Sequence, residues 1–329
     1  MEYPRLRENV WHVQPDAAES FLITTDGSFQ VPTDEVLTFL RVRSHCTGFN
    51  SLDEIAAKSA VPLEKIKSIL TALQEIDLVI PPDQAGAPPP SVDLARDKAI
   101  KICKIWAEEL KQSYIANQLA GSALPKTVLV GWLIEMYHYI KDFSYAIEHG
   151  ARVATGPLRT LLERYAREER GHEEFVTSTL TNIGLSRAEV ERSSPLPSTR
   201  LIGFIMREMF ALEPASTLMM AALVESQEFD AGGVADFEKV LEEQYQLPAG
   251  AMAPYFKHQQ IDTDLGHSRL LEDNIQLFSV TDPEKLDAIV NKLHDLKHSF
   301  DLQGTEIKSY YNDMQGRYLP RQPIGFHAL

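Results

Sequence analysis

Three segments of the sequence place an acidic residue three positions before a histidine, each within a stretch that predicts a helix. The pairs are Glu135 with His138, Glu169 with His172, and Asp264 with His267. Residues three apart share one face of an α-helix, so each pair could offer a carboxylate and an imidazole to one metal ion. One such pair alone is more typical of a solvated surface. Repetition of the spacing on facing helices is how helical bundles build carboxylate-rich di-iron or di-manganese sites.

Further carboxylates complete this hypothesis. Glu225 follows the apolar run LMMAALV, where an unpaired carboxylate would be costly, and Glu228 is the alternative three residues later. Carboxylate oxygens and imidazole nitrogens suit Fe(II) and Mn(II), and open coordination positions suit O₂ chemistry.

The segment HQQIDTDLGH contains two candidate pairs that an ideal helix cannot aim at one ion. His258 and Asp262 are four residues apart on one face. His267 comes nine residues after His258, which is about 180° round the helix. One alternative is that one pair faces solvent. We predict instead a bulge between 262 and 267, near Gly266, that brings His258, Asp262 and His267 to the metal and turns Asp264 away.

A stripe of aromatic and Met side chains accompanies the first pair. Such a stripe is more often plain core, but beside a metal it would exclude water and shape an apolar substrate cavity. The stripe consists of Trp132, Met136, Tyr137, Tyr139 and Phe143.

The elements that must position these residues are helices, separated mainly by proline and glycine. Apolar periodicity predicts helices over about 92–120, 125–148, 156–183, 186–194, 198–212, 214–229, 233–246, 250–278 and 282–314. No strand-type alternation competes with them. The sequence therefore predicts an α-helical bundle of seven or more helices.

The chain before residue 81 predicts strands as well as helices. Strand-like stretches flank Asp26-Gly27, a hairpin signal, and helical periodicity follows, with a capping box from Ser51 to Glu54. A hairpin followed by three helices is typical of a winged-helix module. We therefore predict a mainly α protein whose small α+β winged-helix domain precedes the bundle. Its boundaries are residues 1–80 for the winged helix, 81–91 for a Pro-rich linker, 92–315 for the helical domain and 316–329 for an irregular tail.

Composition narrows the classes of partner. The 32 Lys and Arg residues against 47 Asp and Glu give a formal charge of −15, which argues against nucleic acid or an anionic membrane as the main partner. Two cysteines exclude a disulfide framework or a Cys-rich zinc site. The sequence shows neither a membrane span nor a signal peptide, so we expect a cytoplasmic protein.

The order of these motifs resembles the haem-oxygenase-like di-iron oxidases and oxygenases, which share a seven-helix fold with thiaminase II and pyrroloquinoline-quinone synthase C. The resemblance covers about residues 95–280, and EERGHEEF followed by NIGL is its most specific part. It implies Fe(II), as one or two ions, with O₂ as co-substrate. It departs from the family's His-x-x-x-Asp-x-x-His pattern in the last helix. If His258 and Asp262 match the pattern, Leu265 takes the place of the second His; if Asp264 and His267 match it, Gln260 takes the place of the first. The implied ligands are Glu135, Glu169, His172, Glu225, His258, Asp262 and His267, with His138, Glu228 and Asp264 as possible additions.

The N-terminal segment resembles the small peptide-binding winged helix of pyrroloquinoline-quinone protein D. The stretches that carry this likeness are FLITTDGSFQVPTDEVLTFLRV and SLDEIAAKSAVPLEKIKSILTALQEIDLV. Such modules bind ribosomal precursor peptides by adding a strand to their sheet edge. A DNA-reading winged helix is the alternative, and the acidic balance of the segment disfavours it.

Together these features predict an iron-dependent, O₂-activating oxidase or oxygenase of specialised (natural-product) metabolism. Its substrate would be amino-acid-derived or a peptide, changed by oxidative C–H, C–N or C–C bond chemistry. One alternative is a cofactorless oxidase resembling pyrroloquinoline-quinone synthase C, and another is a non-catalytic peptide-binding scaffold. The family resemblance also suggests a homodimer.

Overall fold

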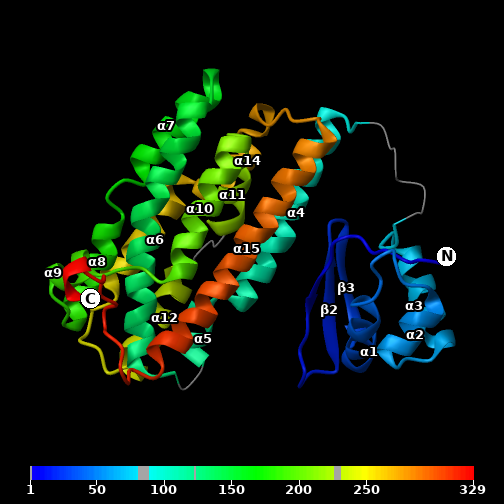
Figure 1. Ribbon diagram of the computed structural model, residues 1–329, viewed down its shortest axis with the longest axis horizontal. Coiled ribbons are helices and arrows are strands. Elements are labelled where there is room, and N and C mark those ends of the chain that lie inside the picture. The colour runs from blue at the N-terminus through cyan, green and yellow to red at the C-terminus, as the bar shows by residue number, and fades with distance from the viewer. Residues whose placement is uncertain (1, 81–88, 122–123, 226–230) are drawn as a thin grey trace. The chain divides into compact units, whose positions relative to one another are not determined.

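The computed structural model describes residues 2–80, 89–121, 124–225 and 231–329. The chain divides into two compact units, Met1–Pro90 and Ser91–Leu329 (Figure 1). No described helix is both long enough and apolar enough to cross a membrane. The predicted class, mainly α with a small sheet at the N-terminus, is confirmed.

The N-terminal unit is an antiparallel sheet followed by three helices. Strands β1 (Val10–His12), β2 (Glu19–Thr24) and β3 (Gly27–Pro32) pair in the order β1-β2-β3, and β2 and β3 form the predicted hairpin. The helices are α1 (Thr33–Arg43), α2 (Leu52–Ser59) and α3 (Leu63–Glu75). The capping box predicted at Ser51 and Glu54 begins α2. One apolar cluster, which includes Leu22, Phe39, Ile55 and Ile66, joins the sheet to the helices.

The second unit is a helical bundle built around α6 (Lys126–Val153), whose residues from Val128 to Tyr137 are all buried. Helices α7, α8, α10 and α15 pack against α6, and α4 packs against α11 and α15 (Figure 1). The other elements are α4 (Val92–Ser113), α5 (Ile115–Gly121), α7 (Gly156–Glu168), α8 (Glu173–Ile183), α9 (Arg187–Arg192), α10 (Pro197–Leu212), α11 (Ser216–Val224), α12 (Ala231–Gln244), α13 (Ala253–Leu265), α14 (Leu270–Asp273) and α15 (Pro283–Tyr311).

Three helices that we predicted as continuous are broken: 92–120 is divided at Tyr114 into α4 and α5, and the other two breaks lie at candidate ligands. The predicted helix 156–183 stops at Glu168 and restarts at Glu173, and Gly171 between them has a φ of +91°. The predicted helix 250–278 stops at Leu265, where Gly266 at φ +72° leads into a 3₁₀ turn over His267–Arg269. The left-handed region costs glycine little, so each glycine allows the chain to change direction. The backbone is therefore distorted where we predicted, but the prediction of a bulge within a continuous helix is wrong, because the helix ends at Leu265.

Gly131 on α6 should be intolerant of substitution. A Cβ at this position would lie 2.2 Å from Cδ2 of the Tyr311 ring, which is fully buried on α15. Because overpacking of this kind typically costs about 1–3 kcal/mol, Gly131→Ala is expected to lower the free energy of unfolding by at least that amount. Urea denaturation measures it. Gly121→Ala is the control, since a Cβ there meets nothing within 4 Å, and equal stability of the two variants would contradict the packing account.

Candidate metal centre

Six acidic and histidine side chains converge inside the helical unit in two groups that share Glu169. The first metal group is Glu169, His172, His258 and Asp262, and the second metal group is Glu169, Glu225 and His267. Within each group, one potential ligand atom from every residue lies within 4.8 Å of all the others. Four of the six side chains come from two segments: Glu169 and His172 from the break between α7 and α8, and His258 and Asp262 from α13.

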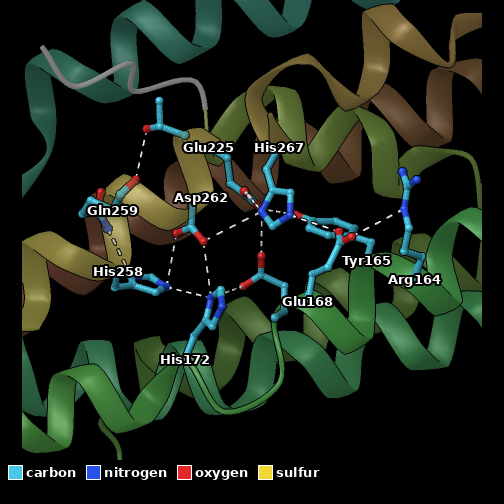
Figure 2. A network of polar contacts seen from close by, with 11 residues as sticks. Arg164, Tyr165, Glu168, His172, Glu225, His258, Gln259, Asp262 and His267 are labelled. Atoms are coloured by element: carbon cyan, nitrogen blue, oxygen red, sulfur yellow. Dashed lines mark hydrogen bonds and ion pairs between the residues drawn. The ribbon is translucent and has the colours of Figure 1, made fainter. Parts of the chain in front are cut away.

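In the first metal group, the imidazoles of His172 and His258 meet beside the carboxylate of Asp262. Nδ1 of His172 lies 3.4 Å from Oε2 of Glu169 and 3.3 Å from Oδ1 of Asp262. Nε2 of His258 lies 3.2 Å from Oδ2 of Asp262 and 3.1 Å from Nδ1 of His172. Two imidazoles and two carboxylates therefore converge on one small volume; Figure 2 shows three of them, His172, His258 and Asp262.

The second metal group is arranged round Nδ1 of His267. This nitrogen lies 2.8 Å from Oε1 of Glu169 and 2.9 Å from Oε2 of Glu225. Asp262 reaches towards both groups, because its Oδ1 lies 3.9 Å from the same nitrogen. Glu169 places Oε2 near His172 of the first group and Oε1 near His267 of the second, so its carboxylate would be available to an ion in either group.

Unsatisfied buried atoms test whether these residues fit a metal. Buried polar atoms nearly always have hydrogen-bond partners, because an unpaired one is costly. In the described part of the chain seven buried side-chain atoms lack one, and four belong to the cluster: Oε1 of Glu169, Oε2 of Glu225, Oδ1 of Asp262 and Nδ1 of His267. They lie close to one another, yet no hydrogen bond is aligned between them. Potential ligand atoms held this close together without aligned hydrogen bonds suit a cation that coordinates them all once His267 is deprotonated.

The predicted single helix would not produce this arrangement. Glu169 and His172 lie in the four residues between α7 and α8 and are both buried, at 3% and 7% exposure. His258 and Asp262 are one turn apart on α13, and His267 returns to them only because the helix ends at Gly266. The residues that the sequence spacing selected here do lie together, and the backbone breaks supply the convergence.

Burial and mutual charge shift the pKa values of the cluster. Burial raises the pKa of Glu225 to about 7, although His267 opposes the shift. Burial would lower the pKa of both His172 and His267, but their carboxylate neighbours outweigh it and raise these values to about 9 and about 11. Burial would likewise raise the pKa of Glu169, and the two histidines outweigh it and lower the pKa to about 2. Without metal, the cluster therefore holds two imidazolium ions at neutral pH.

Metal binding should consequently release protons. Imidazole must be neutral and a carboxylate ionised to ligate, so His172 and His267 are expected to give up about two protons per chain when iron binds at pH 7, and Glu225, with a pKa of about 7, to add part of a third. The apparent affinity for Fe(II) should then rise with pH up to about 11, the pKa of His267, and more steeply below about 9, where His172 must also lose its proton. Anaerobic calorimetry in buffers of different ionisation enthalpy measures the proton count. Binding without proton release, and an affinity independent of pH from 6 to 8, would show that His172 and His267 are not both protonated in the metal-free protein.

The structure does not bring the first predicted pair to the cluster. Glu135 is fully buried, but its carboxylate accepts hydrogen bonds from the Leu196 amide, from Thr199 Oγ1 and from the Tyr311 hydroxyl. His138 lies within hydrogen-bond distance of Ser193, with Nε2 2.7 Å from Oγ, and burial lowers its pKa to about 4. The prediction of Glu135 and His138 as ligands is corrected, because other partners on α10, α15 and the α9–α10 connection already satisfy them.

Two further candidates do not join the cluster. Asp264 is exposed and accepts a hydrogen bond from Gln260 Nε2 at 2.8 Å, so it faces away from the cluster. Glu228 lies outside the described residues.

A cavity of about 100 Å³ adjoins the cluster. Glu169, Glu225, His258 and Asp262 line its polar side, and no Lys or Arg is among its described lining residues. Apolar and aromatic side chains form the rest, among them Met136, Tyr139, Phe143, Tyr255 and Phe300. Three members of the predicted aromatic and Met stripe therefore line the cavity, whereas Trp132 and Tyr137 are buried in the core instead.

The sequence analysis did not identify two side chains, Tyr165 and Glu168, that contact the candidate ligands Glu225 and His267. The Tyr165 hydroxyl donates a hydrogen bond to Oε1 of Glu225, and the ring stands edge-on to His267 with centroids 4.8 Å apart. Oε2 of Glu168 lies 3.4 Å from Nε2 of His267, the ring nitrogen that faces away from the cluster. Tyr165 precedes Glu169 by one helical turn, and this i, i+4 spacing was the available signal.

Comparisons with known proteins agree with this picture. A domain of unknown function with a heme oxygenase-like fold, from Shewanella denitrificans OS217, superposes with a TM-score of 0.55 at 20% identity over 68% of this chain and 96% of that one, which shows the fold of the helical unit. A TenA homolog from Pseudomonas syringae pv. tomato DC3000 gives a TM-score of 0.47 at 13% identity over 67% of this chain and 98% of its own. No curated protein matches the chain.

A family model adds what the fold alone does not show. The model is described as an iron-containing redox enzyme, and it matches residues 130–295, a span that contains all six residues of the cluster. With a cluster of this composition and a haem-oxygenase-like fold around it, the chain belongs to this family of iron-containing redox enzymes.

Proposed function

We propose that this protein is an iron-dependent, O₂-activating oxidase or oxygenase of specialised metabolism. Its substrate is a small amino-acid-derived molecule or a peptide, and the reaction is oxidative C–H, C–N or C–C bond chemistry. The observation that carries the proposal is the set of four buried, unsatisfied ligand atoms on Glu169, Glu225, Asp262 and His267. Membership of an iron-containing redox family supports iron as the ion they bind.

The chain's own residues supply the conditions for this chemistry. When bound, iron activates O₂ for attack on the substrate. Glu169 links the two metal groups, so two ions held there would share one ligand. The aromatic wall of the cavity, which includes Tyr139 and Phe143, excludes water and gives an apolar group of the substrate a place beside the cluster.

Oxygen consumption tests this proposal. The protein is loaded anaerobically with Fe(II), mixed with a candidate substrate and then given O₂. We expect substrate-dependent O₂ uptake that disappears when iron is removed. Uptake that persists in metal-free protein would instead support the cofactorless oxidase. A protein that neither binds iron nor consumes O₂ would point to the non-catalytic scaffold.

A second function is proposed for the N-terminal unit, namely binding of a precursor peptide by strand addition. In the described residues β3 pairs with β2 on one side, and no strand pairs with its other side. An unpaired strand edge presents a row of N–H and C=O groups that an extended peptide can join. The six residues of β3 leave room for a short peptide strand.

Backbone methylation of the peptide tests strand addition. The probe is a precursor peptide encoded beside this gene, and calorimetry measures its affinity for the full chain. N-methylation of alternate residues should abolish binding in one register and preserve it in the other, because only every second amide of an added strand pairs with the sheet. Equal tolerance of both methylated peptides would contradict strand addition.

A further inference from the structure

Tyr165 is a fully buried phenol whose side-chain hydrogen bond and nearest ring contact are both with the second metal group, while Phe143 stands further off at 6.1 Å between ring centroids. It lies on α7, four residues before Glu169, with an exposure of 0%. Its hydroxyl donates to Oε1 of Glu225, and its ring stands edge-on to His267 at an interplanar angle of 66° (Figure 2). The hydroxyl of a buried tyrosine usually finds a hydrogen-bond partner, and here the partner is a candidate metal ligand.

This hydrogen bond divides the two oxygens of Glu225 between two roles. Oε1 accepts from Tyr165, while Oε2 lies 2.9 Å from Nδ1 of His267 and has no aligned hydrogen bond. Glu225 follows the last residue of α11, with φ −101° and ψ 12°, and therefore lies outside the regular helix. The Tyr165 hydroxyl is thus the described contact that fixes which oxygen faces the cluster.

His267 has an independent support on its opposite nitrogen. Oε2 of Glu168 lies 3.4 Å from its Nε2, and Arg164 lies 3.6 Å from the other oxygen of Glu168 (Figure 2). A carboxylate on the outer nitrogen of a ligating histidine fixes its ring orientation. Removing the Tyr165 hydroxyl while keeping its ring should therefore disturb Glu225 and leave His267 in place.

We propose that Tyr165 is a positioning residue for the second metal group: its hydroxyl occupies Oε1 of Glu225 and leaves Oε2 as the single ligating oxygen. This inference rests on the proposed function, because it presumes that the cluster holds iron. Partners of this outer kind typically change metal affinity by about 10–100-fold. The effect of Tyr165 should fall on the second metal group alone, because its contacts do not extend to His172, His258 or Asp262.

The experiment compares Tyr165→Phe with wild type in anaerobic Fe(II) titrations, which give the stoichiometry and the affinity of each ion. Wild type is expected to bind two irons, and Tyr165→Phe to bind one of them about 10–100-fold more weakly with the other unchanged. Tyr311→Phe is the matched control. It also removes a buried hydroxyl from a carboxylate, that of Glu135, which lies outside the cluster.

The outcomes separate this inference from the function on which it rests. Wild-type protein that binds no iron would overturn the proposed function. Wild-type binding with an unaltered Tyr165→Phe variant would overturn the role of Tyr165 and leave the function standing. Loss of both irons in Tyr165→Phe, or the same loss in Tyr311→Phe, would show a general structural effect and would also contradict the proposal. Thermal denaturation of the metal-free variants records any change in folding separately from iron binding.

Discussion

Glu169→Gln is expected to abolish tight iron binding at both positions of the cluster. The side chain offers one oxygen to each metal group, so the substitution removes the shared charge and weakens a ligand of each ion at once. Losing an outer partner of a ligand already costs about 10–100-fold, so losing this ligand should cost more than about 100-fold at both positions. Elemental analysis after anaerobic loading and desalting measures iron per chain.

Glu135→Gln is the matched control for this experiment. Glu135 is equally buried and also precedes a histidine by three residues, but its carboxylate is bonded to Leu196, Thr199 and Tyr311. The variant is expected to retain the iron content of wild type. Loss of iron from Glu135→Gln with retention in Glu169→Gln would reverse the ligand assignment that the structure supports.

His172→Ala is expected to lower the iron content from two ions per chain to one. It takes an imidazole from the first metal group and leaves the three residues of the second metal group in place. His138→Ala is the comparison, since His138 is also largely buried and belongs to another of the three predicted acid–histidine pairs, but it contacts Ser193. The same iron content in wild type and His172→Ala would exclude His172 as a ligand. Iron loss in His138→Ala would instead indicate that Glu135 and His138 bind iron.

Much of the ligand set could be predicted because its chemistry is local in sequence. Acid–histidine spacing on apolar helices indicated Glu169, His172 and His267, and the cost of an unpaired buried carboxylate indicated Glu225. The same reasoning selected Glu135, because spacing describes one helix face and says nothing of which neighbours that face meets. Thr199 and Tyr311, which satisfy Glu135, lie 64 and 176 residues away in sequence.

The backbone breaks at the cluster could not be predicted from apolar periodicity, for a related reason. Apolar periodicity continues through Gly171 and Gly266, so both segments were predicted as unbroken helices. A single glycine in a helical pattern is tolerated at a modest cost, and tertiary contacts decide whether the helix ends there. The winged-helix identity of the first unit, its peptide partner, the homodimer and the cytoplasmic location remain predictions.

The location of bound iron would show directly whether the two metal groups are the iron site. Crystals of protein loaded anaerobically with Fe(II) would be measured on both sides of the iron absorption edge to map anomalous scattering. We expect one anomalous peak among Glu169, His172, His258 and Asp262, and a second among Glu169, Glu225 and His267. Iron bound elsewhere, or a cluster that stays free of iron in a protein shown to be loaded, would contradict this assignment.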